Sequence, residues 1–556
     1  MAPKQDDPLT FTEVDEVGHP TATYIYSKSN SGRSTTGRID VLHPPYSTSL
    51  SWSIAALQNL LVEVFLPAGY PHSVSEDYVQ YQIFDSLQAF CSSIAGLLSS
   101  RAVLQGVGVG NASASPTSAL LLHILQDTSG RIATILFAHR VGTALEPECK
   151  MYRLAADVFN DFAMILDCLS PMIPSGSCRV GVLSTAGVLR ALCGVSGGSS
   201  KASLSAHFAK WGNLAEVNAK DSSQETVISL IGMLVGSLVV SHITSYTATW
   251  ISLITLLTVH LGMNYAAVRA VQMTSLNRQR ANIVFSTLLD SDLPHALDTT
   301  ASETTPAPNT TATATATTPT NHLPHWQICT PAQAAKQERI FSRGSILNWT
   351  TAQTVSTVGT CEIGLSLHQF ITSHNHYTYD VTPKSTTSLK TPLPLPRLTE
   401  LFTDEPYLLF LSRSTKSTWH ATICLKPTST TKDQLKAWMH ALLCARLLST
   451  PSTSPSIFPS TSTSTPKPSH PNPTTTTNST EETAPGTEET EETEPVLKTL
   501  THTLHFLNTA SRFKTYLSAL AATGWDLDVA ALETQSGRRV SFSRSLPSTP
   551  TSTSTF

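Results

Sequence analysis

Hydrophobic and polar residues alternate along this chain in long blocks. Between Glu225 and Arg269 the sequence contains no Asp, Glu, Lys or Arg. That run is long enough for two bilayer crossings of roughly 20 residues each, and the polar stretch Thr244–Thr247 inside it predicts a hinge. The pattern therefore predicts a helical hairpin made of Val227–Ile243 and Thr249–Val268, lying either in lipid or in a protein core.

Other apolar stretches precede this hairpin: Leu87–Gln105, Thr117–Ala138, Leu154–Ile173 and Val180–Val195. The third carries Asp157, Asp161 and Asp167, which predicts an amphipathic helix with one wet or interior-facing side. Thr117–Ala138 is interrupted by Asp127–Arg131. This interruption predicts either a broken helix at membrane depth or, as we favour, two short helices joined by a turn.

Basic residues flank the hairpin on both sides: Lys201, Lys210 and Lys220 before it, and Arg269, Arg278 and Arg280 after it. A hairpin returns to the side that it left, so the positive-inside rule places both flanks in the cytosol or an equivalent compartment. Gly232 and Gly236 form a GxxxG pattern, which predicts close contact with another helix. We favour the membrane for this hairpin over the core of a soluble protein.

A faint internal repeat links two regions of the apolar block. Asp85–Leu98 aligns without gaps to Asp221–Leu234, and each copy begins with Asp-Ser-x-Gln before a stretch of low charge. Duplicated units are common in transporters, where sites lie near the repeat interface. The alternative is that each Asp caps a helix N-terminus, or that the match reflects composition alone.

Polar residues near the ends of the apolar stretches are the candidate ligand or pathway residues. Arg101 either snorkels to the interface or pairs with an acid such as Asp85. The full candidate set is Asp77, Tyr78, Asp85, Gln88, Arg101, Lys220, Asp221 and Gln224.

Composition divides the chain into folded and low-complexity parts. Residues 1–58 are a polar N-terminal region with one predicted strand, Thr23–Ser27, and residues 59–290 are the apolar block. Thr/Pro-rich tracts at 291–325 and 450–495 and the tail at 539–556 are predicted to be disordered. Residues 326–449 and 496–538 then form two parts of one C-terminal α+β domain.

The C-terminal domain has its own local signals. Tyr407–Leu411 and Trp419–Leu425 predict a β-hairpin. Asp433 opens a helix to about Leu448, with Thr430 or Thr431 as its cap. Leu500–Ala522 predicts a further helix closed by Gly524.

Charge and cysteine usage argue against several classes of protein function. Charged residues make up 14% of the chain and the net charge is −4, so no basic field indicates nucleic acid. The nine cysteines contain no CxxC pair, which predicts buried free thiols and no metal site. No catalytic motif is visible, so we expect no enzyme, and the N-terminus lacks the apolar segment of a cleavable secretory signal.

Several long segments resemble the root UVB sensitive family, also described as the vitamin B6 photoprotection and homoeostasis domain. They include 66–90 (LPAGYPHSVSEDYVQYQIFDSLQAF), 151–167 (MYRLAADVFNDFAMILD), 260–277 (HLGMNYAAVRAVQMTSLN) and 433–448 (DQLKAWMHALLCARLL). The resemblance implies a membrane-associated, mainly helical protein. It further implies links to ultraviolet responses, pyridoxal phosphate homoeostasis and pairing between paralogues, but no agreed activity or catalytic residue.

The expected fold is therefore mainly α, with a polytopic helical membrane domain, a smaller α+β C-terminal domain and disordered linkers. The leading hypothesis is a membrane protein that transports or senses a small metabolite linked to vitamin B6, surrounded by lipid and able to pair with a copy or a paralogue. The alternative is a non-transporting scaffold that recruits a partner through its C-terminal domain. A pyridoxal phosphate enzyme would need a Schiff-base lysine, for which Lys201, Lys210 and Lys220 are available. The cofactor and the organelle are left open.

Overall fold

The computed structural model describes most of the predicted folded regions. The residues described are 9–14, 20–28, 37–42, 61–107, 116–174, 176–302, 326–342, 344–351, 354–374, 393–414, 418–450, 488–535 and 537–542. Most of the three tracts predicted to be disordered lies outside these residues. The chain divides into two compact units, residues 1–140 with 149–271 and residues 141–148 with 272–556.

The N-terminal region forms a small antiparallel sheet in the order β1-β2-β3, with strands β1 (Leu9–Val14), β2 (Pro20–Lys28) and β3 (Gly37–Leu42). The strand predicted at Thr23–Ser27 lies within β2 and is confirmed. The strands on either side of it were not predicted, because the surrounding residues are mostly polar and carry little hydrophobic periodicity.

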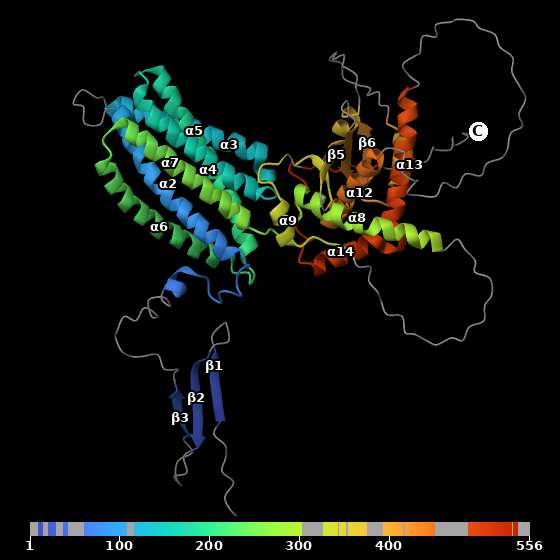
Figure 1. Cartoon of the computed structure of the whole chain (residues 1–556), viewed down its shortest axis with the longest axis horizontal. Helices are drawn as coiled ribbons and strands as arrows, with labels where there is room; N and C mark the ends of the chain where they lie inside the picture. Colours follow the sequence, from blue (N-terminus) through green and yellow to red (C-terminus); the bar gives the residue numbers. More distant parts are fainter. Residues whose placement is uncertain are drawn as a thin grey trace, which may run out of the picture. The chain divides into compact units, whose positions relative to one another are not determined.

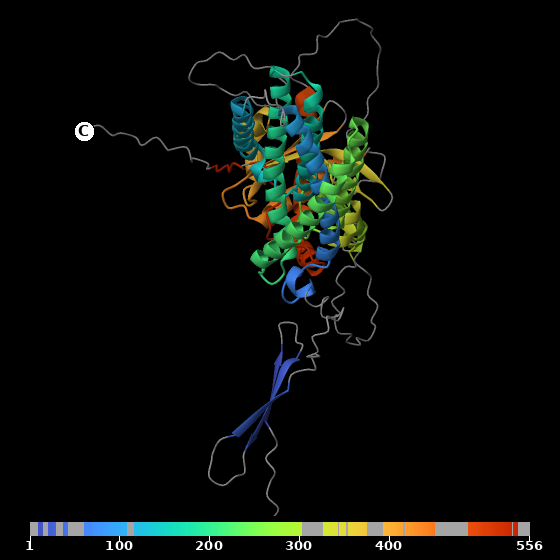
Figure 2. The same cartoon turned by 90° about the vertical axis from the view of Figure 1, so that its left-hand side faces the viewer.

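Long helices make up the rest of the first unit, called here the helical unit. They lie side by side in Figures 1 and 2. The helices are α2 (Tyr78–Val107), α3 (Pro116–Val141), α4 (Cys149–Leu169), α5 (Ser177–Phe208), α6 (Leu214–His242) and α7 (Tyr246–Ala270), with the short 3-10 turn η2 (Ser170–Met172) after α4. Helix α2 packs against both α6 and α7, and α4 packs most extensively against α5.

The charge-free run forms the expected pair of helices. Helix α6 ends at His242, and Ser245 caps α7 by accepting a hydrogen bond from the Ala248 amide at 3.1 Å. The predicted hinge is therefore confirmed. The interruption predicted at Asp127–Arg131 is wrong, because α3 is continuous there. Asp127 and Arg131 form an (i, i+4) ion pair of 2.9 Å along its surface, a pairing that supports a helix.

The GxxxG pattern provides the contact between α6 and α2. A Cβ atom added at Gly232 would lie 2.8 Å from the Ser93 Cβ and 3.0 Å from the Phe90 carbonyl oxygen. At Gly236 it would lie 2.7 Å from a methyl carbon of Leu97. The absence of side chains at both positions allows the two helices to approach closely, as predicted.

The second unit, called here the C-terminal unit, is an α+β domain. Its sheet has the order β4-β5-β7-β6, formed by β4 (Ile346–Thr350), β5 (Val355–Ile363), β6 (Tyr407–Arg413) and β7 (Trp419–Leu425). Its helices are α8 (Arg278–Ser302), α9 (Pro331–Gln337), α10 (Leu367–Thr372), α11 (Leu395–Leu401), α12 (Thr431–Ser449), α13 (Glu488–Asn508) and α14 (Arg512–Ala522), and the short turns η1 (Gly142–Ala144) and η3 (Thr509–Ser511) complete it. Helix α12 packs on the sheet, and fully buried Trp438 lies in this core.

Two of the local predictions for this unit are confirmed. Strands β6 and β7 pair antiparallel, and Thr430 caps α12 in a capping box with Asp433. The single helix predicted at Leu500–Ala522 is wrong. Ala510 and Ser511 adopt positive φ angles of 51° and 56°, which end α13 and begin α14 after a kink.

The boundaries between regions also differ from the prediction. Helix α8 belongs to the C-terminal unit because Ala281, Phe285 and Leu288 pack into its core, so the helical unit ends at Val271 rather than near residue 290. Helix α8 continues to Ser302, and α13 begins at Glu488. Both helices therefore extend into tracts predicted to be disordered.

Candidate functional site

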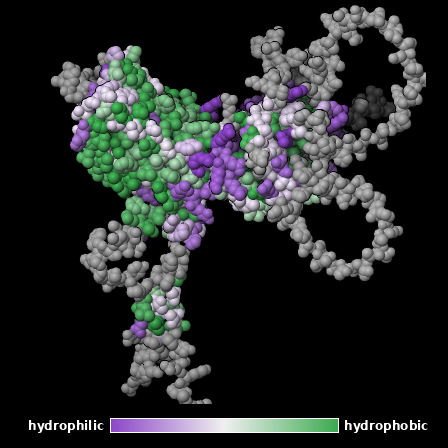
Figure 3. All heavy atoms as spheres, viewed as in Figure 1, coloured by the Kyte–Doolittle hydropathy of each residue, from purple (hydrophilic) through white to green (hydrophobic). Residues whose placement is uncertain are grey.

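The outer face of the helical unit is hydrophobic. Figure 3 shows hydrophobic residues covering most of its visible surface. Leu234 and Leu238 of α6 are 61% and 63% exposed, and Ile135 of α3 is 68% exposed. Among the described residues, helices α2, α5, α6 and α7 are long and apolar enough to cross a membrane. This criterion rests on length and composition alone.

The interior of the same unit contains a buried group of polar side chains, called here the central cluster. It consists of Tyr81, Asp85 and Gln88 from α2, Arg153, Asp157 and Asp161 from α4, and His260 and Asn264 from α7. Arg153 lies at its centre. Its guanidinium contacts Asp85 at 2.6 Å and Asp157 at 3.2 Å. A buried ion pair of this kind is costly to break, because removal of one partner leaves the other charged and desolvated.

A histidine extends the central cluster from Arg153 to a third carboxylate. Arg153 donates to the Gln88 side-chain oxygen at 3.2 Å, and the Gln88 nitrogen lies 2.8 Å from His260 Nε2. His260 Nδ1 lies 2.8 Å from an Asp161 carboxylate oxygen. Asn264 donates to Asp157. Guanidinium, amide, imidazole and carboxylate groups are thus connected across α4, α2 and α7.

A second ion-pair group lies beside α2, one turn before Asp85. Gln82 of α2 donates to Asp221 of α6 at 2.9 Å, and Asp221 pairs with Lys201 of α5 at 2.8 Å. Lys201 also pairs with Glu225 at 2.6 Å, and the Glu225 side chain is half exposed. This group connects the outside of the unit to the polar face of α2.

Helical periodicity explains why these side chains share one face of α2. Tyr78, Tyr81, Asp85, Gln88 and Ser92 recur at spacings of three and four residues, which place them in one stripe. Further along the same helix Ser99 donates to Asp167 at 2.9 Å, and Arg190 of α5 pairs with that aspartate. The polar stripe of α2 therefore faces α4 and α7, while its opposite side exposes Ile83 and Leu87.

Three of the eight candidate residues lie in these polar groups. Asp85 and Gln88 belong to the central cluster, and Asp221 pairs with Lys201. Asp77 and Tyr78 lie at the start of α2, where Asp77 contacts His207 at 3.0 Å and Tyr78 packs edge-on against Phe208 with ring centroids 5.5 Å apart.

The other three candidates bind backbone carbonyl groups. Arg101 donates to the Val240 and Ile243 oxygens at 3.0 and 2.6 Å, which satisfies carbonyls at the end of α6. The alternative in which Arg101 pairs with Asp85 is wrong, because Asp85 pairs with Arg153. Lys220 donates to the Glu63 oxygen at 2.6 Å and Gln224 to the Phe65 oxygen at 2.6 Å. These contacts hold the chain segment before α2 and indicate a structural role.

The sequence reasoning did not select Arg153, His260 or Asn264. A spacing signal was available, because Arg153, Asp157 and Asp161 lie four residues apart and so share one face of α4. His260 and Asn264 are likewise spaced by four in a helix that is otherwise largely apolar. Polar residues at such spacing in an apolar helix indicate a buried polar face.

The structure places the two copies of the proposed repeat in similar positions but in different surroundings. Asp85 lies seven positions after the first residue of α2. Asp221 likewise lies seven positions after the first residue of α6. Gly232 packs tightly against α2, whereas nothing lies within 4 Å of a Cβ atom added at Gly96. The matched glycines therefore have different roles, and the repeat stays a prediction.

The C-terminal unit has paired buried charges of its own. Arg280 contacts Glu338 at 2.6 Å, and Arg278 donates to the Leu532 oxygen at 2.7 Å. Asn277 donates to Glu148 at 3.2 Å, and burial raises the pKa of the Glu148 carboxyl to about 7 even though Arg280 lowers it. Because Arg278 and Arg280 serve this unit, they are not free basic flanks of the predicted hairpin.

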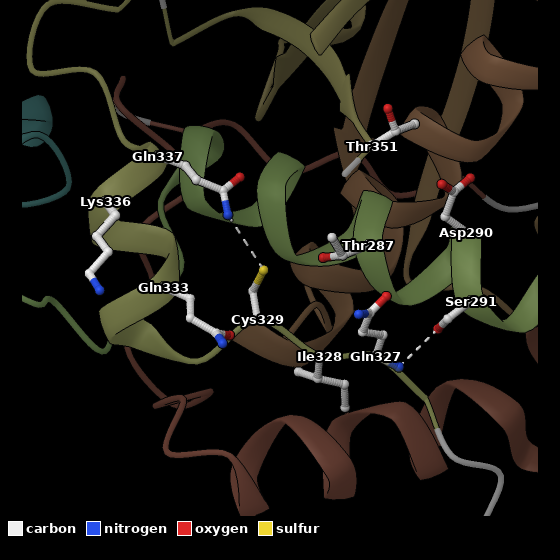
Figure 4. A pocket seen from close by; sticks show the side chains of 10 residues that line it. All are labelled: Thr287, Asp290, Ser291, Gln327, Ile328, Cys329, Gln333, Lys336, Gln337 and Thr351. Atoms are coloured by element: carbon white, nitrogen blue, oxygen red, sulfur yellow. Dashed lines mark hydrogen bonds between the residues drawn. The ribbon is translucent and has the colours of Figure 1, made fainter. Parts of the chain in front are cut away.

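A surface hollow of about 520 Å³ in the C-terminal unit is a second candidate site (Figure 4). Its polar side chains are largely engaged with one another. Gln337 lies 3.8 Å from the Cys329 sulfur, the Ser291 hydroxyl accepts from the backbone N–H of Gln327, and Gln333 completes the capping box of α9. Asp290 and Lys336, the charged residues that line the hollow, are exposed, so we favour the buried central cluster.

Lys201 and Lys220, two of the three lysines considered for a covalent pyridoxal phosphate site, do not fit one. A Schiff-base lysine must lose its proton, which requires an apolar or cationic setting. Lys201 contacts two carboxylates, which favour its charged form, and Lys220 donates to two backbone oxygens. No group of three or more metal-binding side chains occurs in the part of the chain that the structure describes.

Comparison with known sequences gives matches in both units. Residues 52–292 match the profile of the vitamin B6 photo-protection and homoeostasis domain, and residues 389–539 match that of the C-terminal part of root UVB sensitive proteins. No solved structure matches.

The matched relatives are similar over the first of these regions. RUS family member 1 of Dictyostelium discoideum is 45% identical over 235 residues, which cover 41% of this chain and 44% of the relative. Protein root UVB sensitive 3 of Arabidopsis thaliana is 37% identical over 227 residues, covering 41% and 51%. Protein root UVB sensitive 2, chloroplastic, of the same plant is 27% identical over 226 residues, covering 40% and 51%. The chain thus spans about half the length of the curated relatives it matches.

Proposed function

The chain belongs to the root UVB sensitive family, and from that premise we propose that its helical unit lies in a membrane and transports or senses a small metabolite linked to vitamin B6 homoeostasis. One observation carries the proposal: a bundle with exposed leucine and isoleucine side chains encloses ionised groups around Arg153. Charged residues inside membrane helices are expensive and commonly mark substrate or ion pathways.

The chemistry of Arg153 suggests the class of metabolite. A guanidinium binds phosphate and carboxylate groups through paired hydrogen bonds. Phosphorylated B6 vitamers are small anions of this kind. In the structure Asp85 and Asp157 occupy Arg153, so an anionic metabolite would compete with a carboxylate for the same guanidinium.

We propose that lipid surrounds the exposed apolar helices. Pairing of the chain with a second copy or with a paralogue stays a prediction. The lack of an enzymatic activity also stays a prediction. An absorption band of a lysine-bound pyridoxal in the purified protein would contradict it.

The direct test is uptake by lipid vesicles that contain the purified full chain. We expect accumulation of labelled pyridoxal 5′-phosphate above that of protein-free vesicles, and its loss in Arg153→Gln. Arg131→Gln is the matched control, because Arg131 forms an exposed ion pair with Asp127 on α3.

A failure of every vitamer to bind or accumulate would contradict the transport and sensing proposal. It would favour the alternative, a membrane scaffold that recruits a partner through the C-terminal unit. Size-exclusion profiles of the variants show whether a loss of uptake reflects the site or misfolding.

A further inference from the structure

Hydrogen-bond directions in the central cluster define the protonation state of His260. Arg153 donates to the Gln88 oxygen at 3.2 Å, so the Gln88 nitrogen faces His260 Nε2 at 2.8 Å. An amide nitrogen can only donate, so Nε2 accepts and carries no proton. The ring proton is then on Nδ1, which lies 2.8 Å from an Asp161 carboxylate oxygen without the alignment of a hydrogen bond. His260 is neutral in this arrangement.

The charges of the central cluster are unbalanced in this state. Asp85 and Asp157 both contact Arg153, and Asn264 donates to Asp157. Asp161, which is buried, contacts only the neutral imidazole of His260 among the described ion pairs. A buried carboxylate without a cationic partner is costly and favours uptake of a proton or a cation.

We propose that Asp161 and His260 form a proton-binding site, and that Gln88 couples its occupancy to Arg153. A proton taken from water forms an N–H bond at His260 Nε2 and produces an imidazolium that faces Asp161. The Gln88 nitrogen can no longer donate to Nε2, so the amide turns and its oxygen accepts from the new N–H group. This rotation ends the hydrogen bond from Arg153 to Gln88, and loss of the proton reverses it.

Through Gln88, protonation of His260 would change how well Arg153 binds an anion. This step rests on the proposed function. Rotation of Gln88 leaves one N–H group of Arg153 without its acceptor, in a guanidinium that binds anionic oxygens well. An anionic metabolite could then take the place of the Gln88 oxygen. Binding of the metabolite would therefore be favoured by protonation of His260, and each would strengthen the other.

Other titratable groups face this pair from each packed helix. Helix α2 contributes Tyr81 and Asp85, and α4 contributes Arg153 and Asp157. Helix α5 contributes Cys193, which lies within electrostatic range of Asp157 and Asp161. His260 lies 3.7 Å from Asp157 as well. Asp85 and Asp157 carry the negative charge beside Arg153, whereas the Tyr81 hydroxyl and the Cys193 thiol are uncharged at neutral pH.

Access from outside follows the polar stripe of α2. Glu225 is half exposed and contacts Lys201, which contacts Asp221. Asp221 accepts from Gln82, which precedes Asp85 by three positions and so lies on the same helix face. Polar contacts therefore run from the surface of the unit to Gln82, about one turn of α2 from Asp85.

The test is a titration of His260 by nitrogen NMR in the full chain, labelled at histidine and held in lipid nanodiscs without any metabolite. His260→Gln identifies the signal. We expect Nδ1 to carry the proton at high pH and both nitrogens at lower pH. Asp161→Asn should weaken proton binding at least about tenfold, since it removes the facing carboxylate. Gln88→Glu should strengthen it at least about tenfold, because a carboxylate accepts the new proton without rotation.

Asp127→Asn is the matched control, because it makes the same chemical change at an exposed ion pair on α3 and should leave the His260 titration unchanged. If Asp161→Asn does not fold, Gln88→Glu decides alone, since its expected shift has the opposite sign. An identical titration in the wild type and in Gln88→Glu would overturn the proposal. Because no metabolite is present, a failure of vitamer uptake contradicts the proposed function and not this proton site.

Discussion

The two units of this chain distribute polarity in opposite ways. The helical unit exposes apolar side chains such as Leu234 and Leu238 and buries Arg153 among carboxylates. The C-terminal unit buries Trp438, Phe285 and Leu409 in one continuous core between sheet and helices. Its buried arginine at position 280 is matched by Glu338.

Under the proposed function, this difference corresponds to two different surroundings. A core of aliphatic and aromatic side chains is what a domain needs in water. A bundle with an apolar exterior is suited to lipid rather than to water. In lipid its polar groups must pair with one another inside the bundle. The same contrast is the reason for proposing the functional site in the helical unit, around Arg153.

The largest effect on stability is expected when the positive charge of Arg153 is removed. Arg153→Met should destabilise the helical unit by about 3–5 kcal/mol, because it leaves Asp85 and Asp157 buried without a cation. Arg131→Met, at an exposed ion pair, should cost at most about 1 kcal/mol. Thermal unfolding of both variants in detergent measures the difference. Equal costs would contradict a buried, structurally coupled cluster.

The next prediction compares one exposed leucine from each unit. Leu234→Arg should impair membrane integration by about 2.5–3.5 kcal/mol, the cost of arginine at the centre of a membrane helix. Leu367→Arg, at a leucine of α10 that is 41% exposed, should change integration and stability little. Glycosylation-site insertion assays and membrane fractionation measure both. A harmless arginine at position 234 would indicate that this face meets water.

Alanine substitutions at two glycines of the helical unit should change its stability in opposite directions. Gly232→Ala should destabilise the contact between α6 and α2 by about 1–3 kcal/mol, because the new methyl group meets the Ser93 Cβ at 2.8 Å. Gly96→Ala has nothing within 4 Å and should stabilise α2 by up to about 1 kcal/mol. Unfolding midpoints of the two variants provide the comparison. Stabilisation by Gly232→Ala would mean that α6 does not pack here.

The smallest expected effect concerns the C-terminal unit. The pKa of Glu148 is raised to about 7, so its protonated form favours the folded state below the ordinary carboxyl range, and this contribution is lost as pH rises through 7. Glu148→Gln should therefore stabilise the unit at pH 8 by about 1–2 kcal/mol and leave it nearly unchanged at pH 4. Denaturation at both pH values measures this. A gain that is equal at both would contradict burial as the cause.

Local signals in the sequence predict a large part of this fold. The charge-free run predicts α6 and α7, and the glycine pair predicts close contact of α6 with another helix, which is α2 in the structure. Asp433, with Thr430 or Thr431 as the cap, predicts the start of α12. The kink after α13 was missed because Ala510 and Ser511 adopt positive φ without a glycine to signal it. The continuity of α3 was missed because a charged stretch was taken as a break, although its charges pair along the helix.

The central cluster is only partly visible in the sequence. Asp85 and Gln88 stand out because they begin an apolar stretch. Their partners are remote, since Arg153 lies 68 positions from Asp85 and His260 lies 172 positions from Gln88. The spacing of four residues indicates Asp157 as one partner of Arg153, but no local pattern specifies Asp85 as the other. Tertiary packing of α2 between α4 and α7 decides it.

The central claim is that the helical unit lies within a lipid bilayer, and alkaline carbonate extraction of cell membranes that contain the full chain tests it most directly. The account predicts that the protein stays in the membrane pellet with integral proteins, because the apolar faces of α6 and α7 hold it there without ionic contacts. Release of the full chain into the soluble fraction at high pH would contradict the account.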